Sequence, residues 1–360
     1  MKTEFLKYFL AANSGEGFVS EFEQNYDFAD NWHAYIIKGG PGTGKSSFMK
    51  YVAVKAVDMG YTVELCPCSS DPDSLDGVII KEIKVIILDG TAPHVVEPKY
   101  PGICEEIINL GKFWNGEKLR QRAGEIIKVT AKNKKLHKTA AVYISTAGEL
   151  MRDNLNLSKR FTNFKKVEQF ALRLSKQLIP HISQNSPREW VRFIGGVTPK
   201  GVIAFKGTIE DFYKNIIVID DKYGAVANTI MEAVREEALK KGHEIITLKN
   251  PFLPSKLIDH ILIPELSLAI VREYEYINFG SSHRRVHSRR FYEINLLREC
   301  RARLTFNRRV TRELLLGAIE TLEKAKAVHD TLEKYYIDAM DFGALTAFAE
   351  KKAKEILKGD

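Results

Sequence analysis

The strongest restriction on the fold of this chain is an internal repeat with a period of about 182 residues. The aligned pairs are Ile36-Ile37 with Val218-Ile219, Gly42 with Gly224, Met49 with Met231, Val52 with Val234 and Gly60 with Gly242. Solenoid repeats are far shorter, at roughly 20 to 50 residues. The sequence therefore predicts one domain duplicated within the chain, at residues 1–187 and 188–360, which makes the chain an intramolecular pseudo-dimer.

A glycine-rich segment in the first copy, residues 39–46 with the sequence GGPGTGKS, fits the pattern G-x-x-x-x-G-K-[ST]. An apolar run at 34–37 precedes it, and apolar residues at helical spacing follow it up to Gly60. Backbone N–H groups of such a loop surround phosphates, the lysine reaches the β and γ phosphates, and the hydroxyl holds Mg²⁺. We expect the phosphates to be bound by Gly39, Gly40, Pro41, Gly42, Thr43, Gly44, Lys45, Ser46 and Ser47.

An apolar run at 85–88 ends at Asp89, and another strand is expected at 62–66. An aspartate at the end of such a strand helps to hold Mg²⁺ beside the serine of a phosphate loop. We therefore predict that Ser46 and Asp89 are the metal ligands, directly or through water. The alternative is that Asp89 is an ordinary cap at the end of a strand.

The general base is less obvious, because no glutamate follows Asp89; the next residues are Gly-Thr-Ala-Pro-His. His94 and Glu97 lie in a proline-rich loop that leaves this strand at the end expected to face the phosphates. Together with Lys45 and Asp89, these two residues are our candidate catalytic groups. The favoured alternative is that each is an ordinary exposed loop residue.

The second copy has lost the chemical groups of the first. Lys45 is replaced by Ala227, Ser46 by Asn228, Lys38-Gly39 by Asp220-Asp221, and Asp89 by Arg272. Two carboxylates repel a polyanion, and no lysine remains to offset them. We expect that the second copy does not bind a nucleoside triphosphate, and that Arg272 approaches Asp220 or Asp221 to fill the vacated phosphate space.

The net charge of +8 is concentrated in an arginine-rich stretch. From Arg272 to Glu313 there are eleven arginines and no lysine. The arginines could form a solvated or internally paired surface. One of them could reach the nucleotide of the first copy, or the region from Arg284 to Arg312 could bind nucleic acid.

An acidic stretch, Ser69-Ser70-Asp71-Pro72-Asp73-Ser74-Leu75-Asp76, follows the expected strand at 62–66. Its three carboxylates could contact a substrate or a basic partner. The favoured alternative is that Asp71 or Ser74 caps a short helix.

Four cysteines are too few for a disulfide framework and suit a reducing compartment. The chain contains no apolar stretch of 18 residues, and its N-terminus is a poor signal peptide. We expect a cytoplasmic protein without a membrane partner.

At residues 39–46 and at Asp89 the chain resembles the P-loop NTPase superfamily. With the segments at 71–77, 89–94 and 198–201, it is similar to an uncharacterised bacterial family of tandem P-loop ATPases. The resemblance implies an α/β fold with two three-layer α/β/α domains in tandem, each containing a parallel sheet and added helices packed beside it. It also implies ATP and Mg²⁺ as ligands. The chain departs from that family at Ala227, Asn228 and Arg272.

The resulting hypothesis is Mg²⁺-dependent ATP hydrolysis at one site in the first copy, with the second copy as a partner that does not hydrolyse nucleotide. ATP is preferred to GTP because the sequence lacks an Asn-Lys-x-Asp element. One alternative is a phosphotransferase in which Asp73, Asp76 or His94 lies near a small acceptor. Another is a non-catalytic module that binds nucleotide or nucleic acid.

Overall fold

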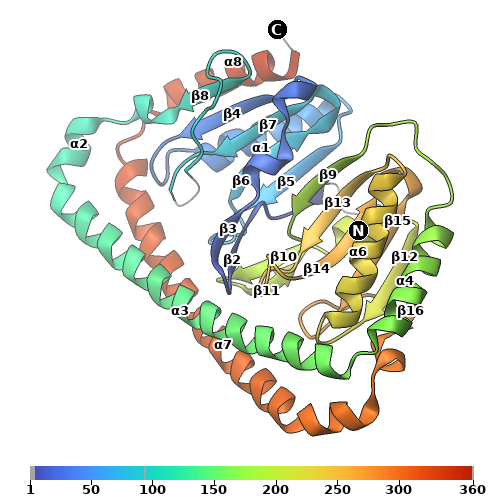
Figure 1. The fold of residues 1–360 in the computed structure, drawn as a ribbon. Coiled ribbons are helices and arrows are strands. Elements are labelled where there is room, and N and C mark those ends of the chain that lie inside the picture. The colour runs from blue at the N-terminus through green and yellow to red at the C-terminus, as the bar shows by residue number, and fades with distance from the viewer. Residues whose placement is uncertain (1–4, 93–94, 359–360) are drawn as a thin grey trace.

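The apolar runs of both copies form the strands of two six-stranded sheets (Figure 1). The computed structural model describes residues 5–92 and 95–358. The first sheet contains, in spatial order, β1 (Leu6–Lys7), β5 (Val63–Pro67), β6 (Leu75–Ile80), β7 (Val85–Asp89), β4 (His33–Lys38) and β8 (Glu105–Asn109). The second contains β9 (Arg188–Arg192), β13 (Glu244–Lys249), β14 (Ile258–Ile263), β15 (Leu268–Glu273), β12 (Asn215–Asp220) and β16 (Arg284–His287). The repeat in the sequence is thus matched by a repeat of strand order.

Both sheets are mixed, so the prediction of a parallel sheet is wrong for one strand in each. β6 runs antiparallel to β5 and β7, and β14 runs antiparallel to β13 and β15, whereas the remaining pairs are parallel. The physical reason is the short connection from β5 to β6. A parallel pair needs a crossover of a dozen or more residues, which the chain does not have there.

One helix follows the strand that lies second from one edge of each sheet. α1 (Lys45–Asp58) begins just after β4, and α6 (Ala225–Lys240) begins just after β12. Both helices start after a glycine with positive φ, 80° at Gly44 and 94° at Gly224, a conformation that other residues rarely adopt. Two small hairpins, β2 (Ala11–Ser14) with β3 (Gly17–Ser20) and β10 (Gly195–Thr198) with β11 (Gly201–Ala204), occupy equivalent places in the repeats.

Several short helical segments complete the connections. They are α2 (Gly116–Gln121), α5 (Gly207–Glu210), and the 3₁₀ turns η1 (Phe22–Asn25), η2 (Phe28–Asp30), η3 (Lys81–Ile83), η4 (Leu110–Phe113), η5 (Pro264–Leu266) and η6 (Ser288–Phe291).

Two long helices, α3 (Ala123–Phe161) and α7 (Ile294–Ile337), lie side by side along one edge of the molecule (Figure 1). They run antiparallel, because Trp114, before α3, bridges to Met340, after α7, while Thr162 bridges to Tyr292 at the other end. Asp153 of α3 also forms an ion pair with Arg303 of α7, at 2.7 Å. The two halves are therefore joined over the full length of this helix pair.

The last helix of each half packs on the other half. α4 (Phe164–Leu178) covers α6 and the second sheet, and α8 (Phe342–Lys358) covers α1 and the first sheet (Figure 1). The buried apolar side chains of α4 are Val167, Ala171 and Leu174, and those of α8 are Leu345, Ala353, Ile356 and Leu357. The expectation that each helical remainder packs beside its own sheet is wrong. The boundary at residue 187 separates two sequence repeats but not two buried cores.

The opposite faces of the two sheets belong to one shared apolar core. Ile36 and Leu88 of the first sheet contribute to it together with Val218 and Val271 of the second. None of its described members comes from α1, α3, α4, α6, α7 or α8. The predicted three-layer α/β/α arrangement is therefore wrong on this side, where the shared core replaces a second layer of helices.

Buried polar contacts also cross between the halves. Phe9 and Phe193 exchange two backbone hydrogen bonds of 2.9 Å each. Arg192 of the second sheet forms a buried ion pair of 2.6 Å with Glu64 of the first. Because a buried ion pair is costly to break, these contacts fix how the two sheets are placed.

Candidate functional site

The glycine-rich loop at 39–44 connects β4 to the first residue of α1. Gly42 and Gly44 adopt positive φ values of 67° and 80°. Thr43 is buried and donates from Oγ1 to the Gly40 carbonyl, at 2.8 Å, which holds the loop in its curved form. The loop therefore ends at the N-terminus of a helix, where free N–H groups and the helix dipole favour an anion.

Lys45 lies over this loop. Its Nζ donates to the carbonyls of Gly39, at 3.1 Å, and Gly40, at 2.8 Å, and it lies 3.7 Å from Oδ2 of Asp89. The hydroxyl of Ser46, the next residue, accepts a hydrogen bond of 3.1 Å from the N–H of Leu75. The cation and the acid predicted from the sequence are thus neighbours, and Ser46 faces the start of β6.

Asp89 is held in a largely buried position at the end of β7. Its Oδ1 accepts hydrogen bonds from the N–H, at 2.9 Å, and the hydroxyl, at 2.5 Å, of Thr91. Burial raises the pKa of Asp89, while Lys45 and Thr91 oppose the rise. A carboxylate that is destabilised by burial gains from a bound cation, as expected of a metal ligand.

Asp76 lies beside Asp89 on the neighbouring strand. β6 and β7 are antiparallel with Gly77 opposite Leu88, so the next position places Asp76 opposite Asp89 on the same face. Asp76 is 4% exposed and adds to the rise in the Asp89 pKa. The site therefore contains two adjacent carboxylates, whose oxygens suit Mg²⁺, and one lysine that can pair with an anion.

His94 and Glu97 are the two loop residues that we named as catalytic candidates, and the structure describes only Glu97. His94 lies outside the described residues. Glu97 is well exposed, and its carboxylate lies 2.6 Å from Nζ of Lys38. Lys38 also donates to the carbonyls of Gly90 and Val96, at 2.9 and 2.8 Å. Glu97 is thus part of the contact that fastens the loop after Asp89 to the end of β4.

The end of α7 and the start of α8 cover the glycine-rich loop. A Cβ on Gly42 would come within 2.8 Å of the Glu333 carbonyl, and one on Gly40 within 2.8 Å of Tyr336. A Cβ on Gly44 would come within 2.9 Å of Leu345. The helices from the second half therefore leave little room for a side chain at these three glycines, and positive φ also favours glycine at Gly42 and Gly44.

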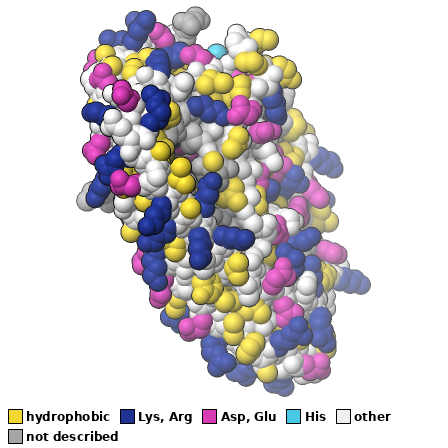
Figure 2. Space-filling view, turned by 90° about the vertical axis from the view of Figure 1, so that its left-hand side faces the viewer, with side chains coloured by type: hydrophobic (Ala, Val, Ile, Leu, Met, Phe, Trp, Pro, Cys, Tyr) yellow, Lys and Arg dark blue, Asp and Glu magenta, His cyan; other side chains and the backbone are white. Residues whose placement is uncertain are grey.

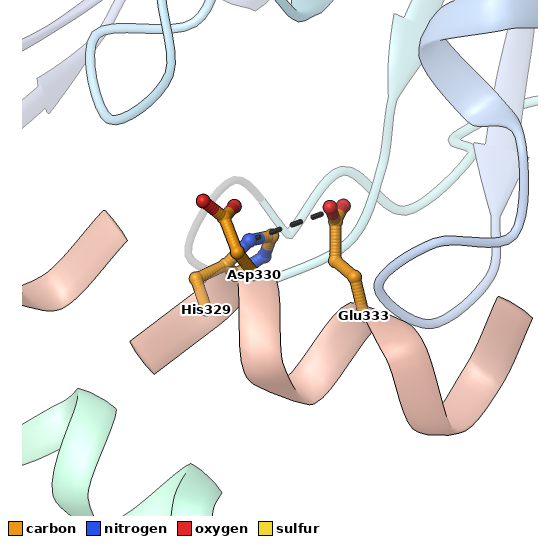
Figure 3. A group of neighbouring side chains, drawn as sticks. All are labelled: His329, Asp330 and Glu333. Atoms are coloured by element: carbon orange, nitrogen blue, oxygen red, sulfur yellow. Dashed lines mark ion pairs between the residues drawn. The ribbon is translucent and has the colours of Figure 1, made fainter. Parts of the chain in front are cut away.

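Polar side chains of α7 project from the helix beside this loop. Figure 3 shows His329, Asp330 and Glu333 on the same side of α7. Their potential ligand atoms lie within 4.8 Å of one another. Lys326, one turn earlier, forms ion pairs with Asp330 and with Asp71 of the first half, the latter at 3.5 Å. Lys326 thus brings a cation from the second half to the rim of the site.

The arginine-rich region does not supply the cation that the second half brings to this site. Arg312 precedes Glu333 by 21 residues of continuous helix, which is about 30 Å along the axis. Arg285 and Arg303 are paired internally, with Glu273 at 2.6 Å and Asp153 at 2.7 Å. The hypothesis of an arginine that reaches the first nucleotide is therefore wrong for this region, and internal pairing accounts for part of it.

The face formed by α2, α3 and α7 carries many Lys and Arg side chains (Figure 2). Acidic and apolar side chains lie between them, so the basic groups do not form one continuous strip in this view. Nucleic acid binding through the region from Arg284 to Arg312 stays an untested prediction.

The equivalent loop of the second half is closed by its own side chains. The Asp221 carboxylate accepts a hydrogen bond of 2.8 Å from the N–H of Ala227, at the start of α6, and others from the Tyr223 N–H and the Tyr292 hydroxyl, each 3.1 Å. An anion supplied by the chain itself thus occupies the helix N-terminus, the place where a phosphate would be bound.

Arg272 is buried beside this carboxylate. Its Nε donates to the main-chain carbonyl of Asp221, at 2.8 Å, and its Nη1 lies 2.8 Å from the carboxylate of Asp259. The predicted approach to Asp221 is confirmed, although through the backbone oxygen. The predicted carboxylate partner was wrong, because Asp259 takes that role and Asp220 pairs with His287 at 3.0 Å.

No family model, curated protein or solved structure matched the chain in our comparisons. The resemblance stated above therefore stays a prediction. The case for a function depends on the geometry of residues 39–46 and their neighbours.

The acidic stretch forms a turn rather than a helix. Ser74 donates from its hydroxyl to the Asp71 carboxylate, at 2.8 Å. The predicted short helix with its cap is wrong, because residues 69–74 form a bend and a turn that lead directly into β6. Asp73 pairs with Lys200 of the second half, at 2.6 Å, and Asp71 pairs with Lys326. The expected basic partner of this stretch is thus the other half of the same chain.

Two further predictions concern the cysteines and membrane-spanning segments. All four cysteines are free, and burial raises the pKa of Cys66 and Cys68. Among the described helices, none has the length and apolarity needed to cross a membrane.

Sequence reasoning named Asp76 only as an acid near a possible acceptor and missed its place beside Asp89. The repeat contained the signal, because Asp259 follows Asp76 by 183 positions and Arg272 follows Asp89 by the same interval. In the second copy one of these positions holds an arginine and the other an aspartate. This exchange indicates that the two side chains are neighbours.

Proposed function

We propose that the chain binds a magnesium complex of ATP at residues 39–46 and hydrolyses its γ-phosphate there. The observation that carries the proposal is the Lys45 ammonium 3.7 Å from Asp89, at the N-terminus of α1. A cation, a buried carboxylate and a row of backbone N–H groups then converge on the end of a strand, where ligands bind in sheets of this kind.

Lys45, Ser46 and Asp89 would each have a separate role in this reaction. Lys45 would exchange the carbonyls of Gly39 and Gly40 for phosphate oxygens and stabilise the negative charge that develops on them. Ser46 and Asp89 would hold Mg²⁺, directly or through water; the ion would neutralise charge between the β and γ phosphates.

Asp76 supports hydrolysis because it supplies the base that is missing after Asp89. It is buried at the start of β6, opposite Asp89. In this proposal Asp76 accepts the proton of the attacking water while Asp89 stays with the metal. The assignment predicts that Asp76→Asn keeps nucleotide binding and loses phosphate release.

The second half would not bind a triphosphate. Asp221 fills the helix N-terminus of that half, and the Arg272 side chain is committed to Asp259 and to backbone carbonyls. The expected stoichiometry is therefore one nucleotide per chain.

Calorimetry with MgATP and MgGTP tests the binding step, and phosphate release without an added acceptor tests hydrolysis. We expect one ATP site, and removal of the Lys45 charge in Lys45→Ala should reduce turnover by about a hundredfold or more. Lys55→Ala is the matched control, because Lys55 lies on the same helix and pairs with Asp58 at the surface.

Absence of ATP binding at about 1 mM, or the same affinity in Lys45→Ala, would contradict the proposal. Phosphate release that requires a small acceptor would instead support the phosphotransferase alternative.

A further inference from the structure

We propose that the surface between α4 and β16 binds the phosphate backbone of a single-stranded nucleic acid. The two elements lie side by side in Figure 1, and Val286 of β16 shares an apolar core with Val167 and Leu174 of α4. Exposed cations from α4, η6, β16 and the residue before β12 accompany this surface. We name it the α4–β16 strip, and its cations are Lys166, Arg173, Lys214, Arg284 and Arg290.

A groove of about 430 Å³ lies at one end of the strip, where the end of α4 meets the first residues of β12 and β16. Among the described residues its ionisable lining side chains are Lys214, His283 and Arg284, and no carboxylate lines it. The groove therefore carries a net positive charge and is suited to an anion.

The spacing of residues on α4 continues the strip beyond the groove. Gln177 lines the groove, and the Phe170 ring lies 5.4 Å from the ring of Phe291 in η6. Residues three or four apart share one side of a helix, so Lys166 and Arg173 stand in the same row as Phe170 and Gln177. From Lys166 to Gln177 this row is about 16 Å long.

Arg290 of η6 lies at the other end of the strip. Its guanidinium carbon lies 5.4 Å from the centre of the Phe170 ring and 5.3 Å from that of Phe291. An arginine that is held over aromatic rings keeps the N–H groups at its edge, which can bind a phosphate. Arg290 therefore extends the row of cations from α4 to the end of β16.

The other cations of the strip have no partner within the described part of the chain. The side chains of Lys166, Arg173, Lys214 and Arg284 are exposed, and none of them forms a hydrogen bond or an ion pair with a described residue. Their charges are therefore available to a ligand.

The negative groups near the strip have partners inside the protein. Asp220 pairs with His287 at 3.0 Å, and Glu293 accepts a hydrogen bond of 2.8 Å from the N-cap side chain of α4. The C-terminal end of α4 carries a partial negative charge, but Lys241 donates to the Ile179 carbonyl there. The strip thus keeps its positive charge.

A linear row of unpaired cations fits a chain of phosphates. One strand of nucleic acid carries a charge about every 3.4 Å along its axis, so about 16 Å spans roughly five phosphates. Single strands are commonly bound in a positive groove that follows their backbone. The groove has the size of a small-molecule site, so it admits a single strand, whereas a duplex or a flat membrane surface cannot enter it.

The proposal is independent of ATP hydrolysis, because the strip contains no residue of the loop at 39–46. Arg284 and Arg290 are the only members of the arginine-rich region that belong to it. Arg285 and Arg303 of that region are paired within the protein, with Glu273 and Asp153.

The test measures fluorescence anisotropy of a labelled oligothymidylate of about 15 nucleotides with the full-length protein, in the absence of ATP. We expect a Kd of about 10 μM or tighter at about 50 mM salt. The affinity should fall steeply as salt is added, because each phosphate contact contributes about 0.7 to the slope of log K against log salt. Phosphatidylserine vesicles and a duplex of the same length are the comparison ligands.

Two double variants with the same loss of charge locate the binding. Arg173→Ala with Arg284→Ala should weaken it by about tenfold or more and lower the salt slope by about 1.4. Lys165→Ala with Lys176→Ala is the matched control, because both lysines are exposed on α4 but lie outside the row that faces the groove. The control should bind within about twofold of wild type.

Absence of binding at about 100 μM protein and about 50 mM salt would overturn the proposal. An equal loss of affinity in the two double variants would also overturn it, because the general charge of the surface would then be responsible. Tighter binding to the vesicles than to the oligonucleotide would assign the strip to an anionic membrane instead. A duplex that binds as tightly as the single strand would refute the assignment to single strands.

Discussion

Arg272 and Asp259 form a buried ion pair, with 2.8 Å between Nη1 and Oδ1, on two neighbouring strands of the second sheet. His260 lies opposite Val271 there, as Gly77 lies opposite Leu88 in the first sheet. The pair thus occupies the positions of Asp89 and Asp76. One change from an acid to arginine converts two carboxylates, which need a cation, into a pair that neutralises itself.

Removing one partner of this pair should be strongly destabilising. Arg272→Met leaves the Asp259 carboxylate buried without its cation, and we expect a loss of about 3 to 5 kcal/mol in the free energy of unfolding. Arg272→Met combined with Asp259→Leu should lose much less, since no buried charge remains. Urea titration measures both, and a double variant as unstable as the single one would show that packing rather than charge is responsible.

Asp89→Asn should stabilise the nucleotide-free protein at pH 7. Burial raises the pKa of Asp89 in the folded state, so its favourable contribution is present at low pH and is lost as the pH rises through that pKa. The variant should therefore gain stability near neutral pH and little below pH 4, while Mg²⁺-dependent nucleotide binding falls more than tenfold. Thermal unfolding across this pH range measures the gain in stability. Equal gains near neutral pH and below pH 4 would contradict the prediction.

Lys326→Ala should slow hydrolysis with little effect on nucleotide affinity. Lys326 joins α7 to Asp71 at the rim of the site but lies outside residues 39–46. Removal of one partly buried cation should lower kcat by about tenfold. Lys324→Ala, which changes an exposed residue of the same helix, is the control. An unchanged kcat in Lys326→Ala would limit Lys326 to a structural role.

The stability of the protein should fall between about pH 6.5 and pH 4 because of His260. Burial lowers the pKa of His260 to about 4, so stability that is present above its unfolded pKa is lost as the pH falls towards the folded value. The largest contribution is about 3 kcal/mol. His260→Gln should flatten the profile, whereas His287→Gln, at an exposed position, should not. Parallel profiles for wild type and His260→Gln would refute the assignment.

A chain cut between the repeats should stay associated. A protease site introduced at residues 184–187, which are exposed, breaks the covalent link but leaves α4 on α6 and α8 on α1. We expect the two fragments to elute together in gel filtration and neither fragment to refold alone. A fragment of residues 1–187 that folds cooperatively by itself would show that α8 is dispensable for the first core.

The local features of the chain could be predicted from the sequence. The glycine-rich loop, the helix after it and the strand that ends at Asp89 all formed where the pattern placed them. Positive φ at Gly42 and Gly44, and apolar residues at strand or helical spacing, are decided by neighbouring residues. For the same reason the loss of Lys45 and Asp89 from the second copy could be read directly.

The direction of β6, the place of Asp76 beside Asp89, and the exchange of α4 and α8 were decided only by the tertiary structure. The exchange has a specific physical cause. Because the two halves are repeats, α1 and α6 present similar apolar surfaces, and either terminal helix could cover either one. The antiparallel pairing of α3 and α7 decides the outcome, since it carries the end of each helix to the opposite sheet.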